Sequence, residues 1–450
     1  MPVLSALALL ALAKGGIARE AAGLTIENIE ADATVRTRAI LLRGKAPEAV
    51  VRLKGAGPET EFPVVNGQWA GIVELKPGAN MVAAKCGRSL VRMRVNYRPA
   101  KDPYTVRAVY LLASDEEPGY IGNNRATEAD VRARFVTMAE TIQAFAAEAL
   151  AEGGYERKAF TLATDPKGNV AVDFVRLDRT GDELRKLDGQ ALYNLIEPTL
   201  GQRYDYGKTK IIALMGFTRY DVATQTKLAH TALGGGGLAL FGSGPLRFWP
   251  TSIAGVPRAF GDGRRIDPKV EFDDSGLRER AWANAATTYG ACLHELGHAF
   301  GLPHSPDPRC IMSRGFDQIN RAWDLREPNE GAPDNVFTPD TRSHWDPAWA
   351  MRLDLSPWFQ PDGPPAPSGD APKIEIKDGR ISLSGTDLRV FGYWAEGPNF
   401  GVTQVFSAKT PPGLPPFEVS ELLKILRPGE KLHLYAIDRF GRDVDIVANP

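Results

Sequence analysis

Apolar and polar positions follow three different patterns along the chain. From residue 23 to 98 they alternate at period two in short runs, as in 91–97 (VRMRVNY). The dipeptide Asn66-Gly67 stands between two such runs, where it signals a hairpin turn. This pattern predicts a small, all-β, sandwich-like domain at 23–98.

Between residues 103 and 360 the pattern changes to strands that alternate with helices, which is typical of an α/β layer. Apolar runs at 105–113 and 210–217 predict two buried strands. Thr127 is placed to cap a helix, and we expect that helix to cover the sheet. Five apolar residues recur along one of its faces: Val131, Phe135, Met138, Ile142 and Phe145.

Two further helices, a linker and a second β domain are expected downstream. The segment 278–299 predicts one helix, and Asp346-Pro347 can start the other because proline is tolerated in a first turn. The proline-rich segment 361–372 has the composition of a linker. Alternation over 373–450 predicts a C-terminal all-β domain. The predicted fold class is therefore α/β (α+β), with a central domain flanked by two small all-β sandwich-like domains.

The first 20 residues have the texture of a signal peptide. An apolar run spans residues 3–13 and small residues follow it, but no Lys or Arg precedes it. We expect export, to the periplasm or outside the cell, with an ordinary buried segment as the alternative. No later stretch approaches the roughly 18 consecutive apolar residues of a transmembrane helix.

The charge balance excludes some partners. The chain carries 54 basic and 55 acidic side chains, so no overall field attracts nucleic acid or an anionic membrane. Its three cysteines, Cys86, Cys292 and Cys310, allow one disulfide at most. Two unpaired thiols at 292 and 310 are the preferred interpretation, with a bridge between them as the alternative.

The densest chemistry lies in HELGHAFGLPH, residues 294–304. His294 and His298 are four residues apart on a predicted helix, so they share one face and can bind one ion. Glu295 lies beside them, where its carboxylate can reach a metal-bound water. Gly301 can end the helix in a left-handed conformation, which turns the chain and brings His304 to the same ion. Three neutral histidines leave a tetrahedral zinc one open position, which indicates a catalytic site.

This segment resembles the HExxHxxGxxH signature of the metzincin zinc peptidases, and Met312 resembles their Met-turn. Ser305 and the short run to Met312 resemble matrixins, but Ser-Arg-Gly-Phe follows Met312 in place of the matrixin continuation. Together with 345–359 and the flanking β domains, the chain more closely resembles a family of zinc metallopeptidases described from fungi and invertebrates. That resemblance covers about residues 104–360.

The resemblance implies a metzincin-type catalytic domain, with a twisted five-stranded mixed sheet and an active-site helix under a cleft. It implies that Met312 forms an apolar floor beneath the three imidazoles. It also implies that an antiparallel edge strand binds the substrate in extended form by β-augmentation. Four residues stand in the right order to form that strand: Leu238, Ala239, Leu240 and Phe241.

Together these observations predict a zinc-dependent endopeptidase with one catalytic Zn²⁺ and a protein or peptide substrate. A zinc-bound water would attack the scissile carbonyl, with Glu295 as its general base and later as proton donor to the leaving amine. One alternative is an inactive zinc protein whose β domains bind carbohydrate or protein. Another is a zinc amidase for non-peptide amides. An intact Glu295 argues against the first.

Three other histidines and two carboxylates are further candidates. For His230 a hydrogen-bonded structural role is the preferred interpretation, with a place near the cleft as the alternative. For His344, capping or surface placement is preferred over packing near the cleft. His433 alternates within a predicted strand and needs no role. Asp273 and Asp274 raise the question of calcium, but too few oxygen ligands are recognisable nearby to predict a site.

Overall fold

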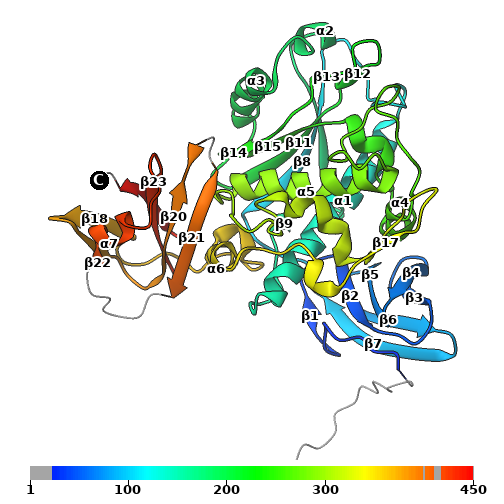
Figure 1. Ribbon diagram of the computed structural model, residues 1–450, viewed down its shortest axis with the longest axis horizontal. Coiled ribbons are helices and arrows are strands. Elements are labelled where there is room, and N and C mark those ends of the chain that lie inside the picture. Colours follow the sequence, from blue (N-terminus) through cyan, green and yellow to red (C-terminus); the bar gives the residue numbers. More distant parts are fainter. Residues whose placement is uncertain (1–22, 399–400, 410–416, 449–450) are drawn as a thin grey trace, which may run out of the picture.

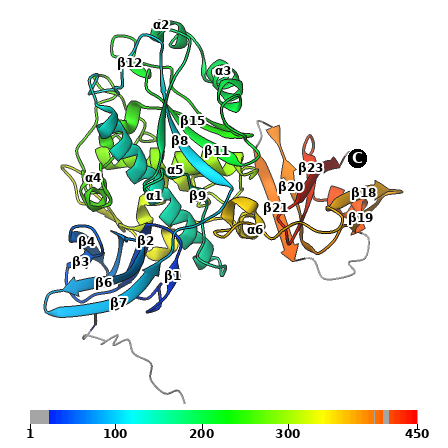
Figure 2. The ribbon, with the colours of Figure 1, turned by 180° about the vertical axis from the view of Figure 1, so that it is seen from behind.

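The computed structural model describes residues 23–398, 401–409 and 417–448, so the expected signal segment at 1–20 lies outside it. Figures 1 and 2 show three groups of strands, near the N-terminus, in the centre and near the C-terminus, with the long helices α1 and α5 at the centre. In the described part of the chain, no helix is both long and apolar enough to cross a bilayer.

The central sheet is mixed and has the strand order β10-β8-β11-β15-β14, with β9 beside β8. All its strands run parallel except β14, which is antiparallel to β15. The bounds are β8 Thr105–Leu112, β9 Thr161–Leu162, β10 Val172–Arg176, β11 Thr209–Met215, β14 Ala232–Gly235 and β15 Leu238–Gly242. The two strands expected from the apolar runs at 105–113 and 210–217 are β8 and β11.

Helices cover both faces of this sheet. Ile212 of β11 packs in the cluster that includes α1 (Glu128–Glu152) and α5 (Ala281–Ala299), whereas the adjacent Ile211 packs with α3 (Gly189–Gly201). Because successive side chains point to opposite faces and both faces are buried, the strand reads as a continuous apolar run.

The sequence signals for α1 are confirmed. Thr127 accepts a hydrogen bond from the backbone N–H of Asp130, as an N-cap residue does. The five residues expected along the buried face are between 0 and 2% exposed. At the far end of the domain, Asp346 caps α6 (Pro347–Leu355) and Pro347 occupies its first turn.

The expected edge strand at Leu238–Phe241 is wrong. These residues belong to β15, which lies between β11 and β14 and is buried along its whole length. The edge of the central sheet is β14, residues Ala232–Gly235. The apolar character of 238–241 reflects burial between two neighbouring strands, and the adjacent small residues form the edge.

The N-terminal sheet contains seven strands in the order β1-β7-β6-β3-β4-β5-β2 and packs against α1 through β2 (Figure 1). Asn66 and Gly67 both have positive φ, 51° and 75°, which confirms the hairpin between β4 and β5. The strands are β1 Thr34–Val35, β2 Ala39–Lys45, β3 Val50–Lys54, β4 Thr60–Val65, β5 Gln68–Glu74, β6 Gly78–Cys86 and β7 Ser89–Tyr97.

The C-terminal strands form two sheets, β18-β19-β22 and β21-β20-β23-β24, with α7 (Val419–Leu423) alongside. Their bounds are β18 Lys373–Lys377, β19 Arg380–Ser384, β20 Leu388–Glu396, β21 Val402–Lys409, β22 Phe417–Glu418, β23 Lys431–Asp438 and β24 Asp443–Ala448. Short elements complete the described chain: α2 Gly181–Leu184, β12 Arg219–Asp221, β13 Thr226–Leu228, α4 Val256–Phe260, β16 Arg326–Glu327 and β17 Asn335–Val336.

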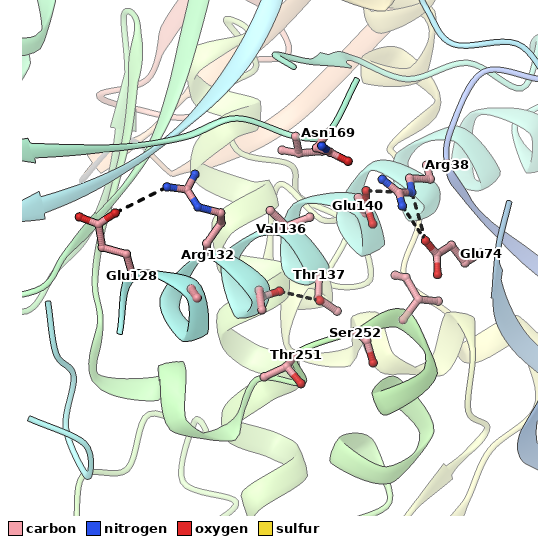
Figure 3. Close-up of a pocket in the computed structure, with 14 residues that line it drawn as sticks. Arg38, Glu74, Glu128, Arg132, Val136, Thr137, Glu140, Asn169, Thr251 and Ser252 are labelled. Carbon is pink, nitrogen blue, oxygen red and sulfur yellow. Dashed lines mark hydrogen bonds and ion pairs between the residues drawn. The ribbon is translucent and has the colours of Figure 1, made fainter. Parts of the chain in front are cut away.

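A hollow of about 620 Å³ lies alongside α1 and is bordered by residues 169–170, by residues 251–253 and by Arg38 and Glu74 of the N-terminal domain. Figure 3 shows Arg38 at one end of it, between Glu74 of β5 and Glu140 of α1. The Arg38 guanidinium lies 2.9 Å from the Glu74 carboxylate and 3.7 Å from that of Glu140. Burial raises the pKa of Glu140 to about 7, although Arg38 opposes the shift.

We predict that Glu140→Gln stabilises the protein above pH 7. The pKa of Glu140 is higher in the folded protein than in the unfolded chain, so ionisation of this buried carboxyl lowers the free energy of unfolding. This loss is absent below about pH 4.5, grows up to about pH 7 and is constant above it. The gain at pH 8 should be about 1–3 kcal/mol. Thermal unfolding at pH 4.5 and pH 8 measures it. Glu128→Gln, at the exposed rim of the same hollow, is the control, and an equal gain at both pH values would contradict the prediction.

Candidate metal centre

Helix α5 places His294 and His298 one turn apart, with ring centroids separated by 4.7 Å. The Nδ1 atom of His294 lies 2.7 Å from the carbonyl oxygen of Ile311, and that of His298 lies 2.7 Å from the carbonyl oxygen of Leu302. Because a carbonyl oxygen can only accept, each Nδ1 carries the proton and donates it. Each Nε2 therefore presents a lone pair.

The two Nε2 lone pairs face each other at 3.1 Å. Burial, followed by the neighbouring imidazoles, lowers the pKa of His294 to about 3 and that of His298 to about 4. Both rings are therefore neutral at physiological pH, as a metal ligand must be. Two acceptors so close together repel each other unless a cation lies between them, and this donor set therefore fits a zinc ion.

A third imidazole joins the pair after a sharp turn. Helix α5 ends at Ala299, and Gly301 follows with a φ of +84°, which confirms the left-handed position expected there. The returning chain places His304 with its ring centroid 5.3 Å from that of His294 and 4.7 Å from that of His298. Ligand nitrogens of the three histidines lie within 4.8 Å of one another.

Met312 lies directly against the helix that carries the first two histidines. It is fully buried, and a Cβ atom on Gly297 would come within 2.2 Å of its sulfur. Its carbonyl oxygen accepts a hydrogen bond from the backbone N–H of Ser305, the residue after the third histidine. The Met312 side chain thus occupies the space left by Gly297, and its backbone is hydrogen-bonded to the loop that follows His304.

Glu295 enters the same cavity from α5. Its side chain is buried, and burial alone raises its pKa to about 8. The cavity has a volume of about 490 Å³ and is lined by the edge strand, the histidine segment and the C-terminal sheet: Ala232, Leu233, Gly234, His294, Glu295, His298, Pro303, His304, Trp394, Glu396, Val402 and His433.

Edge strand β14 lies unusually close to α5. A Cβ atom on Gly234 would come within 2.2 Å of the carbonyl oxygen of Glu295. The Tyr193 hydroxyl of α3 donates a hydrogen bond to the carbonyl oxygen of Gly235 at 2.9 Å. Gly234 therefore brings the backbone of β14 close to the backbone of the helix.

Sequence reasoning missed the C-terminal wall of the cavity, formed by Trp394, Glu396, Val402 and His433. His433 was expected to need no role. Period-two alternation does place Trp394 and Glu396 on the same face of β20, and this is the sequence signal from which a shared role could have been predicted. Which face turns toward the histidines depends on how distant segments pack, which alternation does not specify.

The remaining candidates have protein partners. His230 lies 3.2 Å from Asp274, which also pairs with Lys227, and Asp273 accepts a hydrogen bond from Asn284. His344 pairs with Asp307 at 2.8 Å, in the loop after His304. All three cysteines are free and buried, so 292 and 310 form no bridge.

A helix carrying HExxH, a third histidine after a glycine turn and a mixed sheet beside them define a candidate three-histidine metal centre. Residues 23–384 match a family described as "Metallopep: Putative peptidase family", and the chain belongs to that family. This match, together with two fungal relatives named putative zinc metalloproteinases, confirms the predicted resemblance to zinc metallopeptidases from fungi.

Named relatives agree with this assignment. A protein of Schizosaccharomyces pombe named a putative zinc metalloproteinase is 27% identical over 335 residues, which are 68% of this chain and 54% of that protein. A Saccharomyces cerevisiae protein of the same description is 26% identical over 348 residues, 67% of this chain and 49% of that protein. The chain thus spans about half the length of the curated relatives it matches.

Among solved structures, catalytically inactive OgpA from Akkermansia muciniphila, in complex with an O-glycopeptide substrate, aligns with a TM-score of 0.44. The alignment has 18% identity and covers 77% of this chain and 93% of the OgpA chain.

We predict that Gly234→Ala disturbs the site, whereas Gly235→Ala does not. The new methyl group at 234 would overlap the backbone of Glu295, but at 235 it would meet only the Tyr193 hydroxyl, at 3.6 Å. Overpacking of this kind costs about 1–3 kcal/mol. Thermal unfolding of the two variants measures the difference, and equal unfolding temperatures would show that β14 is not held against α5.

Proposed function

We propose that the chain is a zinc-dependent endopeptidase that cleaves polypeptides bound in extended conformation. The proposal rests on one observation: three converging imidazoles, Glu295 and a sheet edge share a single cavity. A binding protein needs no buried carboxylate beside a set of metal ligands.

His294, His298 and His304 would hold the zinc ion, which when bound supplies a Lewis acid that polarises the scissile carbonyl and activates water. Glu295 would take one proton from the attacking water and deliver it to the leaving amine. Its buried position favours this shuttle, because burial raises the proton affinity of the carboxylate. Met312 would keep the floor of the site apolar and packed.

Strand β14 would bind the substrate. Among the described strands it is the last one of the central sheet, so one row of its backbone groups faces no other described strand, and an extended peptide can pair with it. Leu233 and Gly234 of this strand line the cavity beside Glu295. A peptide paired there would carry its backbone across the metal centre.

Two alternatives remain distinguishable from this proposal. An inactive zinc protein whose β domains bind carbohydrate or protein would show no turnover that depends on Glu295. An amidase for non-peptide amides would hydrolyse small amides but leave polypeptides intact. The sheet edge in the cavity favours a polypeptide over both.

We predict that Glu295→Gln abolishes proteolysis and spares zinc binding. Loss of a general base typically lowers the rate by about 10²–10⁴-fold. Hydrolysis of unfolded casein, together with zinc content by elemental analysis, measures both effects. His298→Ala is the matched control and should lose zinc as well as activity. Unchanged proteolysis by Glu295→Gln would refute the catalytic assignment.

A further inference from the structure

The four-stranded C-terminal sheet has two faces with different partners. Trp394 of β20 and Tyr435 of β23 belong to the large core that includes α1 and α5, whereas Phe391 and Leu434 of the same strands pack in a separate small core. One face of this sheet is therefore part of the catalytic domain's interior. In Figure 1, β20 and β21 lie near the end of β14, and residues of all three strands line the metal cavity.

Helix α6 fixes the position of this sheet. The ring of Trp349 contacts those of Trp394 and Tyr435, with centroids 6.2 and 6.3 Å away. Arg352 of α6 pairs with Asp443 at 3.0 Å and lies 3.7 Å from Asp445, both on β24. Large buried rings and ion pairs hold the sheet in one orientation toward the histidines.

The end of the sheet face that carries Trp394 and Tyr435 forms one wall of the metal cavity. Trp394 and His433 are cross-strand partners, and their rings stack with centroids 4.4 Å apart and planes 15° apart. His433 lies 3.0 Å from the Glu396 carboxylate through Nε2 and 3.8 Å from the Asp445 carboxylate through Nδ1. Glu396 is partly exposed in the cavity, and only its Oε2 atom pairs with His433.

Glu396 is the carboxylate of this wall, and its surroundings are close to charge balance. Glu396, Asp443 and Asp445 carry three negative charges. Against them stand Arg352, Lys431, which is the cross-strand partner of Glu396, and at most one imidazolium from His433. Among the described residues that line the cavity there is no Lys or Arg. His433 pairs with Oε2 of Glu396, and within the described part of the chain Oε1 has no ion-pair partner, so it can accept from a cationic donor of a bound molecule.

We propose that Glu396, Trp394 and His433 form a subsite that selects a basic side chain, Lys or Arg, of the polypeptide substrate. The aromatic rings would pack along the aliphatic stem and the carboxylate would pair with the charged head. This proposal rests on the proposed peptidase function. It adds a specificity role for strands β20–β24, residues 388–448, which lie outside the segment 23–384 that matches the family.

Paired fluorogenic peptides test the subsite. The two peptides of a pair differ at one position, which holds Arg in one peptide and its uncharged analogue citrulline in the other. Successive pairs place this position at different distances on either side of the cleaved bond. We expect the wild type to prefer Arg at one position by about 10–100-fold in kcat/KM, the range expected for a hydrogen bond to a charged group. Absence of any preference would overturn the proposal without the need for a variant.

Glu396→Gln should reduce this preference at least tenfold, through a lower kcat/KM for the Arg peptide. Glu375→Gln on β18, which does not line the cavity, is the matched control and should behave as the wild type. Zinc content and circular dichroism establish that the variants are folded. The proposal would be overturned if the ratio of kcat/KM for the Arg peptide to kcat/KM for the citrulline peptide is the same in the wild type and in Glu396→Gln.

Calorimetric binding separates this proposal from the peptidase assignment. The Glu295→Gln protein, with and without Glu396→Gln, is titrated with the same peptide pairs. Hydrolysis that depends on Glu295, without any effect of Glu396, refutes only the subsite. Absence of hydrolysis together with selective, Glu396-dependent binding of the Arg peptide refutes only the peptidase assignment.

Discussion

Two unprotonated imidazole nitrogens face each other at 3.1 Å inside the protein, and the surrounding structure serves to maintain this contact. Protonation would relieve the repulsion, but burial disfavours it, and the carbonyl oxygens of Ile311 and Leu302 fix which nitrogen holds the single proton. A divalent cation would satisfy both lone pairs at once. Binding of such an ion would therefore be linked to the folding of this segment.

The local features of this arrangement could be predicted from the sequence. The spacing of His294 and His298, the helix stop at Gly301 and the return to His304 depend on neighbouring residues and on backbone preferences that act over a few positions. The cap at Thr127 and the turn at Asn66-Gly67 were predictable for the same reason.

Features that depend on packing between distant segments could not be predicted in the same way. The apolar residues 238–241 indicate burial, but burial does not tell an inner strand from an edge strand beside a helix. The true edge contains Gly234 because α5 leaves no room for a side chain there. His433 reaches the cavity because α6 packs against one face of β20 and β23 and turns that face inward. The alternation of apolar and polar residues within the strands does not predict this packing.

The close approach of Gly234 to Glu295 has a mechanical consequence. The strand proposed to receive the substrate and the helix that bears the proposed base touch through their backbones, without an intervening side chain that could change rotamer. Any displacement of β14 is therefore transmitted to α5 at the residue between the first two histidines. Binding of a peptide along β14 and positioning of the Glu295 carboxylate are therefore coupled, and a ligand that distorts β14 would also displace Glu295.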